Sequence, residues 1–191
     1  MSSLSISVDI LARLRHETRA VHEALEQLPF NQALGNGTIT EALTRQFLAR
    51  LYGFVAPFEA QLQSKEELLG PAWELPRRYR AQLLRQDLPD TGTLPLVPEL
   101  PPLATRAQLL GAMYVLEGST LGGQVIARQL AKAGIPARAY FSGHAEQTGP
   151  LWKTFVGLLT QAATPDNADD IVASASLTFQ RLHAWLEQAQ P

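Results

Sequence analysis

Apolar residues recur along most of this chain at intervals of three and four positions, which is the spacing of one face of an α-helix. The pattern predicts six helical stretches, namely residues 10–28, 40–58, 73–88, 105–133, 150–162 and 166–189. Ser7 or Asp9 is expected to cap the first helix and Pro29 to end it. Pro57 is expected to kink the second helix or to fall at an irregular turn. We find no repeat and no convincing strand run. The expected fold is therefore all-α, with six to eight helices in a single domain over residues 1–191.

A proline-rich tract joins the third and fourth predicted helices. Residues 87–102, DLPDTGTLPLVPELPP, contain five prolines. We interpret the tract as an extended connector rather than a domain boundary, because the helices before it are too few to enclose a core. The segment RAYFSGHAEQTGP, which precedes the last two predicted helices, is expected to be irregular.

Composition narrows the class of protein. Apolar residues make up 46% and charged residues 18% of the chain, as in ordinary soluble proteins. The net charge of −2 argues against a nucleic-acid surface, and no apolar run is long enough to span a membrane. The absence of cysteine excludes disulfides and thiolate-held metals. The start of the chain, MSSLSISVDI, lacks the features of a signal peptide, so the expected location is cytoplasmic.

His22 differs from the other three histidines because it is expected to point along the apolar stripe of the first helix. Arg19 and Glu26 flank it at i−3 and i+4, and Arg15 lies seven residues earlier on nearly the same face. A lone histidine on an apolar face is more often a core residue, but an imidazole beside a row of cations suits a metal ligand next to an anionic cofactor. No second ligand recurs at metal-binding spacing, and haem needs only one from the protein.

Glycines interrupt the helix predicted over residues 105–133. The stretch MYVLEGSTLGGQVIARQL (113–130) contains Gly118, Gly122 and Gly123, each of which costs about 0.5–1 kcal/mol in a helix relative to alanine. One interpretation is close helix packing, with Gly111, Gly118 and Gly122 on one side. The other is a flat ligand that lies against the backbone, where a Cβ would collide. The stretch matches no phosphate-binding loop motif.

Two segments together carry a resemblance to a known family. LRHETRAVHEALE (14–26) and YVLEGSTLGGQVI (114–126) resemble the two helices that sandwich haem in the haem oxygenase family. LWKTFVGLL (151–159) and ASASLTFQRLHAWL (173–186) are similar to the bacterial branch associated with bacteriophytochromes. The likeness covers nearly the whole chain.

The resemblance implies an all-α bundle with haem between a proximal and a distal helix. By this likeness, His22 is the iron ligand of the proximal helix. The flexible distal segment that carries catalysis is Gly118, Ser119, Gly122 and Gly123. The residues expected to contact haem, the first three as candidate partners of its propionates, are Arg15, Arg19, Lys153, Glu26, Tyr114 and Phe179.

The activity implied is cleavage of haem to biliverdin, carbon monoxide and ferrous iron. It uses dioxygen and electrons from an external reductant, a reductase or a ferredoxin, and a bacteriophytochrome is the implied receiver of biliverdin. This chain departs from the family at two positions. Many members have an aspartate where Ser119 stands, and some have a basic residue where Gly157 stands. A serine hydroxyl can donate and accept hydrogen bonds, so a network of waters remains possible there.

Two other functions fit the same fold. A protein that binds haem or biliverdin without turnover would have the same cavity, and the missing distal carboxylate favours it. A thiaminase-like hydrolase is the third alternative. Such enzymes commonly use a cysteine nucleophile, which this chain lacks.

Overall fold

The computed structural model describes residues 9–188, which form an all-α structure and confirm the predicted fold class. Over this range the chain forms nine α-helices rather than six to eight: α1 (Ile10–Glu17), α2 (Arg19–Glu26), α3 (Pro29–Gly35), α4 (Glu41–Gln63), α5 (Ala81–Asp87), α6 (Arg106–Lys132), α7 (Ala139–Ser142), α8 (Thr148–Ala162) and α9 (Ala168–Glu187). None of these helices is long and apolar enough to cross a membrane.

The first predicted helix is in fact two helices. The Asp9 side chain caps α1 by accepting the Ala12 N–H; Ser7, the other candidate cap, lies outside the described residues. The helix then breaks at buried Thr18, whose hydroxyl donates to the Leu14 carbonyl at 2.7 Å. Such side-chain bonds compete with the backbone ladder. The prediction of one helix over 10–28 was therefore wrong, as was that of Pro29 as its end: Pro29 begins α3.

The α4 helix continues through Pro57. Proline has no N–H to donate to the carbonyl of Gly53, one turn earlier. The N–H of Val97 donates to that carbonyl instead, at 2.9 Å. A Cβ at position 53 would collide with the Pro95 carbonyl and the Trp185 ring. The proline-rich connector thus packs against α4, and Gly53 provides the space for it.

The predicted helix over 73–88 is mostly absent. Short 3-10 helices occupy Pro71–Trp73 and Leu75–Arg77, and only α5 is α-helical. Proline stands at the start of the first 3-10 helix and inside the second, while Glu74 between them has a left-handed φ of 46°. These features interrupt an α-helix. The segment predicted as irregular likewise contains α7 and a further 3-10 helix, Ala145–Gln147.

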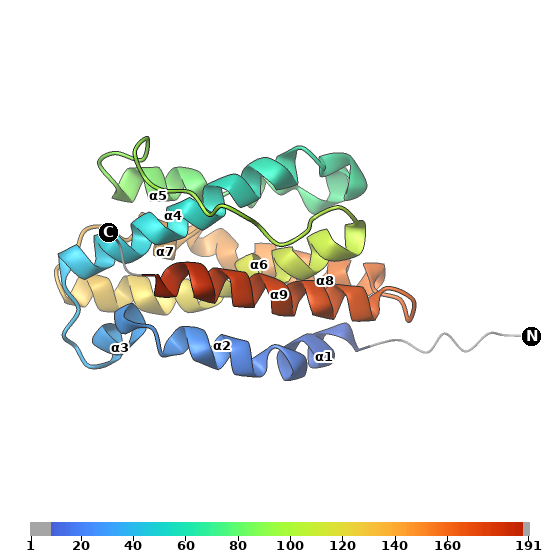
Figure 1. Ribbon diagram of the computed structural model, residues 1–191, viewed down its shortest axis with the longest axis horizontal. Coiled ribbons are helices and arrows are strands. Elements are labelled where there is room, and N and C mark those ends of the chain that lie inside the picture. Colours follow the sequence, from blue (N-terminus) through green and yellow to red (C-terminus); the bar gives the residue numbers. More distant parts are fainter. Residues whose placement is uncertain (1–8, 189–191) are drawn as a thin grey trace, which may run out of the picture.

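Two long helices, α6 and α9, lie side by side through the centre of the molecule (Figure 1). Their close approach depends on Gly111, where a Cβ would collide with the Ile171 carbonyl and Ser174. Figure 1 shows α1, α2 and α3 along one side of this pair and α4 and α5 along the other. The buried apolar side chains form one core cluster that spans these layers.

Candidate functional site

A cavity of about 490 Å³ lies among α2, α3, α4, α6, α7 and α9. Most of the side chains around it are apolar. The polar residues that line it are His22, Glu26, Asn31, Arg80, Ser119 and Tyr140. A concave, mostly apolar cavity with a few converging polar groups is typical of a small-molecule site, and its volume falls in the usual range of roughly 300–1,000 Å³.

His22 lies at the edge of this cavity, not in the core. Its side chain is 58% exposed, so the prediction that it points along a buried stripe was wrong. The reason is the break at Thr18, which ends the stripe of α1 before α2 begins. The ring contacts Phe179 edge-on, with centroids 5.8 Å apart, and its Nδ1 lies 3.5 Å from a Glu26 carboxylate oxygen. With Nδ1 facing Glu26, Nε2 is the nitrogen placed to bind a ligand.

The glycines of α6 have different surroundings, although the helix runs unbroken through all of them. A Cβ at Gly122 would meet nothing within 4 Å, and Gly122 lines the cavity. A Cβ at Gly123 would stand 2.9 Å from the Phe141 carbonyl oxygen, so this glycine lets α7 pack closely. A Cβ at Gly118 would make ordinary contact with Trp152. Of the three, Gly122 leaves open space at the cavity wall, and the packing interpretation holds for Gly111 and Gly123.

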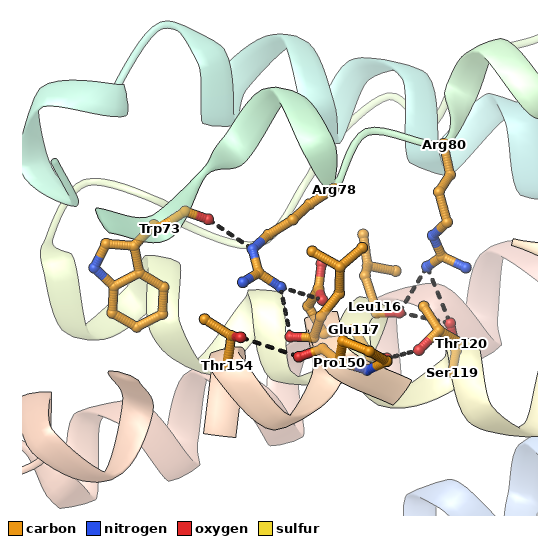
Figure 2. A network of polar contacts seen from close by, with 10 residues as sticks. Trp73, Arg78, Arg80, Leu116, Glu117, Ser119, Thr120, Pro150 and Thr154 are labelled. Carbon is orange, nitrogen blue, oxygen red and sulfur yellow. Dashed lines mark hydrogen bonds and ion pairs between the residues drawn. The ribbon is translucent and has the colours of Figure 1, made fainter. Parts of the chain in front are cut away.

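Ser119 is already engaged in hydrogen bonds. Its hydroxyl donates to the Leu116 carbonyl at 2.7 Å, and its oxygen accepts from the Arg80 guanidinium at 3.2 Å. Figure 2 shows Arg80 reaching down to α6, where it also donates to the Leu116 carbonyl at 2.6 Å. The serine hydrogen therefore points at its own helix, and Arg80 supplies the additional donors at this part of the cavity.

Tyr140 completes this polar group. Arg80 is only 4% exposed, and its guanidinium stacks over the Tyr140 ring at 4.7 Å. Burial raises the pKa of Tyr140, while the charge of Arg80 and a hydrogen bond with Ser119 act in the opposite direction. The hydroxyl thus stays protonated at neutral pH. Sequence reasoning missed both residues; the run RRYR (77–80), ahead of an apolar helix, was the available signal for Arg80.

A buried carboxylate holds Tyr140 in place. Asp87, at the end of α5, accepts the Ala139 N–H at 2.8 Å and the Tyr140 N–H at 2.9 Å. These are the first N–H groups of α7, which have no partner inside the helix. Asp87 thereby fixes α7, and with it the Tyr140 and Phe141 side chains that line the cavity. It was not among the predicted site residues.

A buried ion pair between Arg78 and Glu117 holds α6 in place. Arg78 donates to a Glu117 carboxylate oxygen at 2.8 Å, and only 2% of its side chain is exposed. The same guanidinium donates to the carbonyls of Trp73 at 2.7 Å and Leu151 at 3.1 Å (Figure 2). Arg78 therefore joins its own segment to α6 and α8.

The structure brings some predicted site residues together and not others. The cavity lining contains His22, Glu26, Ser119, Gly122 and Gly123, and Phe179 is adjacent through its contact with His22. The other five residues do not line it: Gly118, Arg15, Arg19, Tyr114 and Lys153.

Besides Gly118, which faces Trp152, three of these five residues have other recorded surroundings. The Tyr114 ring lies 6.1 Å from the Trp152 ring, and the charge of Arg15 acts on its hydroxyl. Arg19 is paired with Glu23 at 2.7 Å on the surface.

Comparison with known proteins agrees with this geometry. A family model described as "Heme oxygenase" matches residues 8–92. A heme oxygenase from Xanthomonas campestris pv. campestris is 35% identical over 165 residues, which are 84% of this chain and 99% of that protein. Two solved structures have the same fold. One is heme oxygenase from Leptospira interrogans, with a TM-score of 0.77 and 19% identity over 94% of this chain and 99% of that one. The other is heme oxygenase-1 from Synechocystis sp. PCC6803 in complex with heme, with a TM-score of 0.76 and 17% identity over 94% of this chain and 91% of that one. The chain therefore belongs to the haem oxygenase family.

Proposed function

We propose that this chain binds haem between α2 and α6 and cleaves it to biliverdin, carbon monoxide and ferrous iron. One observation carries the proposal: the cavity has an imidazole at its α2 edge and bare backbone at Gly122 on its α6 wall. An imidazole can bind the iron of haem, and a wall without a Cβ lets the flat porphyrin approach the helix backbone. The apolar lining suits the porphyrin faces and excludes water from them.

His22 is the residue that would hold the iron of haem. A neutral imidazole binds through one nitrogen, and Glu26, 3.5 Å from Nδ1, would orient the ring as an acceptor for the other. When bound, haem supplies the iron that binds dioxygen and the porphyrin carbon that is oxidised. On the opposite wall, Gly122 permits close approach, and Arg80 and Tyr140 present donors next to Ser119.

The remaining expected contacts extend the proposal. Arg15, Arg19 and Lys153 are proposed partners of the haem propionates, since guanidinium and ammonium groups pair well with carboxylates. Tyr114 and Phe179 are proposed haem contacts. An external reductase or ferredoxin as electron donor, a bacteriophytochrome as receiver of biliverdin and a cytoplasmic location stay predictions from the resemblance.

A second candidate function is binding of haem or biliverdin without turnover. The position of the family's distal carboxylate is occupied by Ser119, whose hydrogen is donated to the Leu116 carbonyl. A site without a proton source would bind haem and leave it intact.

Titration with hemin followed by reductant under air separates the two candidates. We expect a spectrum of histidine-bound haem at one equivalent and its conversion to the spectrum of biliverdin after reduction. Tight hemin binding with no conversion under reductant would favour the binding protein. No saturable hemin binding would contradict both.

A further inference from the structure

We propose that Arg80 makes the α6 wall of the large cavity an anion-binding site, which favours a negatively charged ligand over a neutral ligand of similar shape. The ligand class is a monovalent anion: an aromatic anion in the haem-free cavity, or a small anion bound to the iron of haem. Selection at the iron rests on the proposed function, whereas selection in the haem-free cavity does not depend on it.

Arg80 carries a positive charge to the lining of the cavity. The residue is buried, and it lines the cavity beside Ser119. A guanidinium stays charged in proteins, and a charge inside the protein is costly unless it is paired or hydrogen-bonded. Among the described residues Arg80 forms no ion pair, whereas Arg78, two positions earlier, pairs with Glu117. No contact at the cavity wall therefore cancels the charge of Arg80.

The hydrogen bonds of Arg80 leave part of its guanidinium without a protein partner. Nη2 donates to the Leu116 carbonyl and to the Ser119 oxygen, and Figure 2 shows both bonds leaving this one nitrogen. Nε and Nη1 also carry N–H donors, for which no acceptor is recorded among the described residues. The Tyr140 ring on which the guanidinium stacks is neutral. The donors on Nε and Nη1 are thus available to an anion.

Two carboxylates near Arg80 belong to other contacts. Glu117 is bound to Arg78, and Glu59 accepts the backbone N–H groups of Arg80 and Ala81. Neither of these glutamates lines the large cavity. Burial raises the pKa of both carboxyls, and the charge of Arg80 acts to lower it. Both carboxylates thus help to keep a charged Arg80 inside the protein, while its donors on Nε and Nη1 stay without an acceptor.

The acidic residue of the cavity lining is Glu26, on the other side of the site. Its carboxylate lies at the α2 edge, 3.5 Å from Nδ1 of His22, and its side chain is 61% exposed. Solvent and salt screen an exposed charge much more than a buried one. Arg80, rather than Glu26, therefore decides which charge a ligand at the α6 wall should carry.

Position 119 offers a way to cancel the charge while Arg80 stays in place. The Ser119 hydrogen is donated to the Leu116 carbonyl, so the serine presents only its oxygen to Arg80, at 3.2 Å. Ser119→Asp would place a full negative charge beside the guanidinium. Ser119→Asn would introduce nearly the same shape without a charge. The two variants together separate the effect of charge from the effect of size.

Fluorescence titration with two dyes tests the haem-free protein. Anilinonaphthalene sulfonate and phenylnaphthylamine share an aromatic body, and only the first carries a negative charge. Hydrogen bonds to charged groups are the strong ones, so the ratio of sulfonate affinity to amine affinity should fall about tenfold in Arg80→Gln and in Ser119→Asp. Arg80→Lys and Ser119→Asn should keep most of the ratio of the parent. Arg77→Gln, which removes a guanidinium at an exposed position, is the control and should keep all of it.

The comparison of Ser119→Asp with Ser119→Asn is decisive even if Arg80→Gln does not fold, because both variants retain the Arg80 side chain. Equal dye ratios in these two variants would overturn the proposal. A parent ratio in a folded Arg80→Gln protein would overturn it as well.

Azide and imidazole test the same selection at the iron of the ferric, hemin-loaded proteins. In mildly alkaline buffer azide is an anion and imidazole is neutral, so their affinity ratio should follow the same order of variants as the dye ratio. Hemin binding with equal azide-to-imidazole ratios in Ser119→Asp and Ser119→Asn would overturn the selection of anions at the iron. A parent protein that binds no hemin would instead contradict the proposed function, with the dye result unaffected.

Discussion

Gly122 faces open space at the wall of the cavity, whereas its neighbour Gly123 faces the backbone of α7. This difference decides what a side chain would do at each position. Glycine lowers helix stability by approximately 0.8–1 kcal/mol relative to leucine or alanine. Replacing a glycine therefore raises helix stability only where the added atoms meet no clash. A side chain at Gly122 should stabilise the helix, whereas one at Gly123 should clash with α7.

Gly122→Leu is expected to weaken hemin binding while the haem-free protein becomes as stable as the parent or more so. The leucine would project into the cavity and occupy porphyrin space. Gly118→Ala is the matched control, because its Cβ makes an ordinary 3.7 Å contact with Trp152 and should leave hemin affinity unchanged. Hemin titration and urea denaturation measure the two effects. Equal hemin affinity of Gly122→Leu and the parent would leave no role for backbone exposure at this wall.

His22→Ala should abolish haem turnover and leave the fold intact. The side chain is 58% exposed, so its loss creates no core cavity. Adding imidazole to the variant should restore an axial nitrogen and part of the spectrum of the parent. His16→Ala, an exposed substitution on α1, is the control and should behave as the parent does. Parent-like turnover by His22→Ala without imidazole would show that another group holds the iron.

Ser119→Ala should slow turnover several-fold, up to roughly tenfold, at unchanged hemin affinity. The hydroxyl accepts from Arg80 and bonds with Tyr140, and a lost hydrogen bond costs about 0.5–1.5 kcal/mol. Ser119→Asp should restore a carboxylate beside Arg80 and keep or raise the rate. Single-turnover rates under matched reductant test both variants. If Ser119→Ala reacts as fast as the parent, the packing of Arg80 on Tyr140 holds this group without the serine.

At the scale of elements, the short helix α7 depends on a carboxylate from a distant segment. Asp87→Asn should destabilise the protein by about 1.5–3 kcal/mol, because two charge-assisted hydrogen bonds to the start of α7 are lost or weakened. Hemin affinity should fall as well, since Tyr140 and Phe141 line the cavity. Urea denaturation and hemin titration measure both, with the exposed Asp166→Asn as control. A stability loss with unchanged affinity would mean that α7 keeps its place without the cap.

The long helices could be predicted from the sequence, and the short ones could not. The helices α4, α6, α8 and α9 each carry several turns of apolar periodicity, and the structure begins and ends most of them within two residues of the prediction. The break at Thr18 has no glycine or proline to announce it, because a threonine hydroxyl makes it. The four residues of α7 are too few to show a period, and a tertiary contact to Asp87 holds them.

The same distinction applies to the candidate site. His22, Gly122 and Gly123 lie in helices with recognisable motifs, and the structure places them at the cavity. Arg80 and Tyr140 come from segments whose conformation depends on contacts distant in sequence. The run RRYR was the one local signal for Arg80, and no local pattern marked Tyr140. The contribution of the segment 71–88 to the site is visible only after folding.

At the scale of the whole molecule, His144 should make stability depend on pH. Burial lowers its pKa below 6.5, and the charges of Arg80, Arg78 and Arg77 lower it further, against a hydrogen bond with the Arg78 backbone. The unfolded chain therefore takes up this proton at a higher pH than the folded one does. Stability should fall as the pH drops below 6.5, until the folded-state pKa is passed.

Urea denaturation between about pH 7.5 and pH 5.5 measures this dependence. His144→Gln should show a shallower loss of stability than the parent over that interval. His16→Gln, exposed on α1, should keep the slope of the parent. Identical slopes in all three proteins would show that His144 gains its proton equally in the folded and unfolded chains.

The separation of α2 from the core has a consequence for redesign. The helix contains no fully buried residue, and Thr18 sets it apart from α1. With His22 in its proposed role, a substitution at position 22 is expected to change the axial ligand of haem without repacking the interior. Tyrosine or methionine there would give haem proteins of different reduction potential on one scaffold, because the axial ligand sets that potential. In this chain, the helix that carries the proposed ligand can vary while the helices that form the core stay constant.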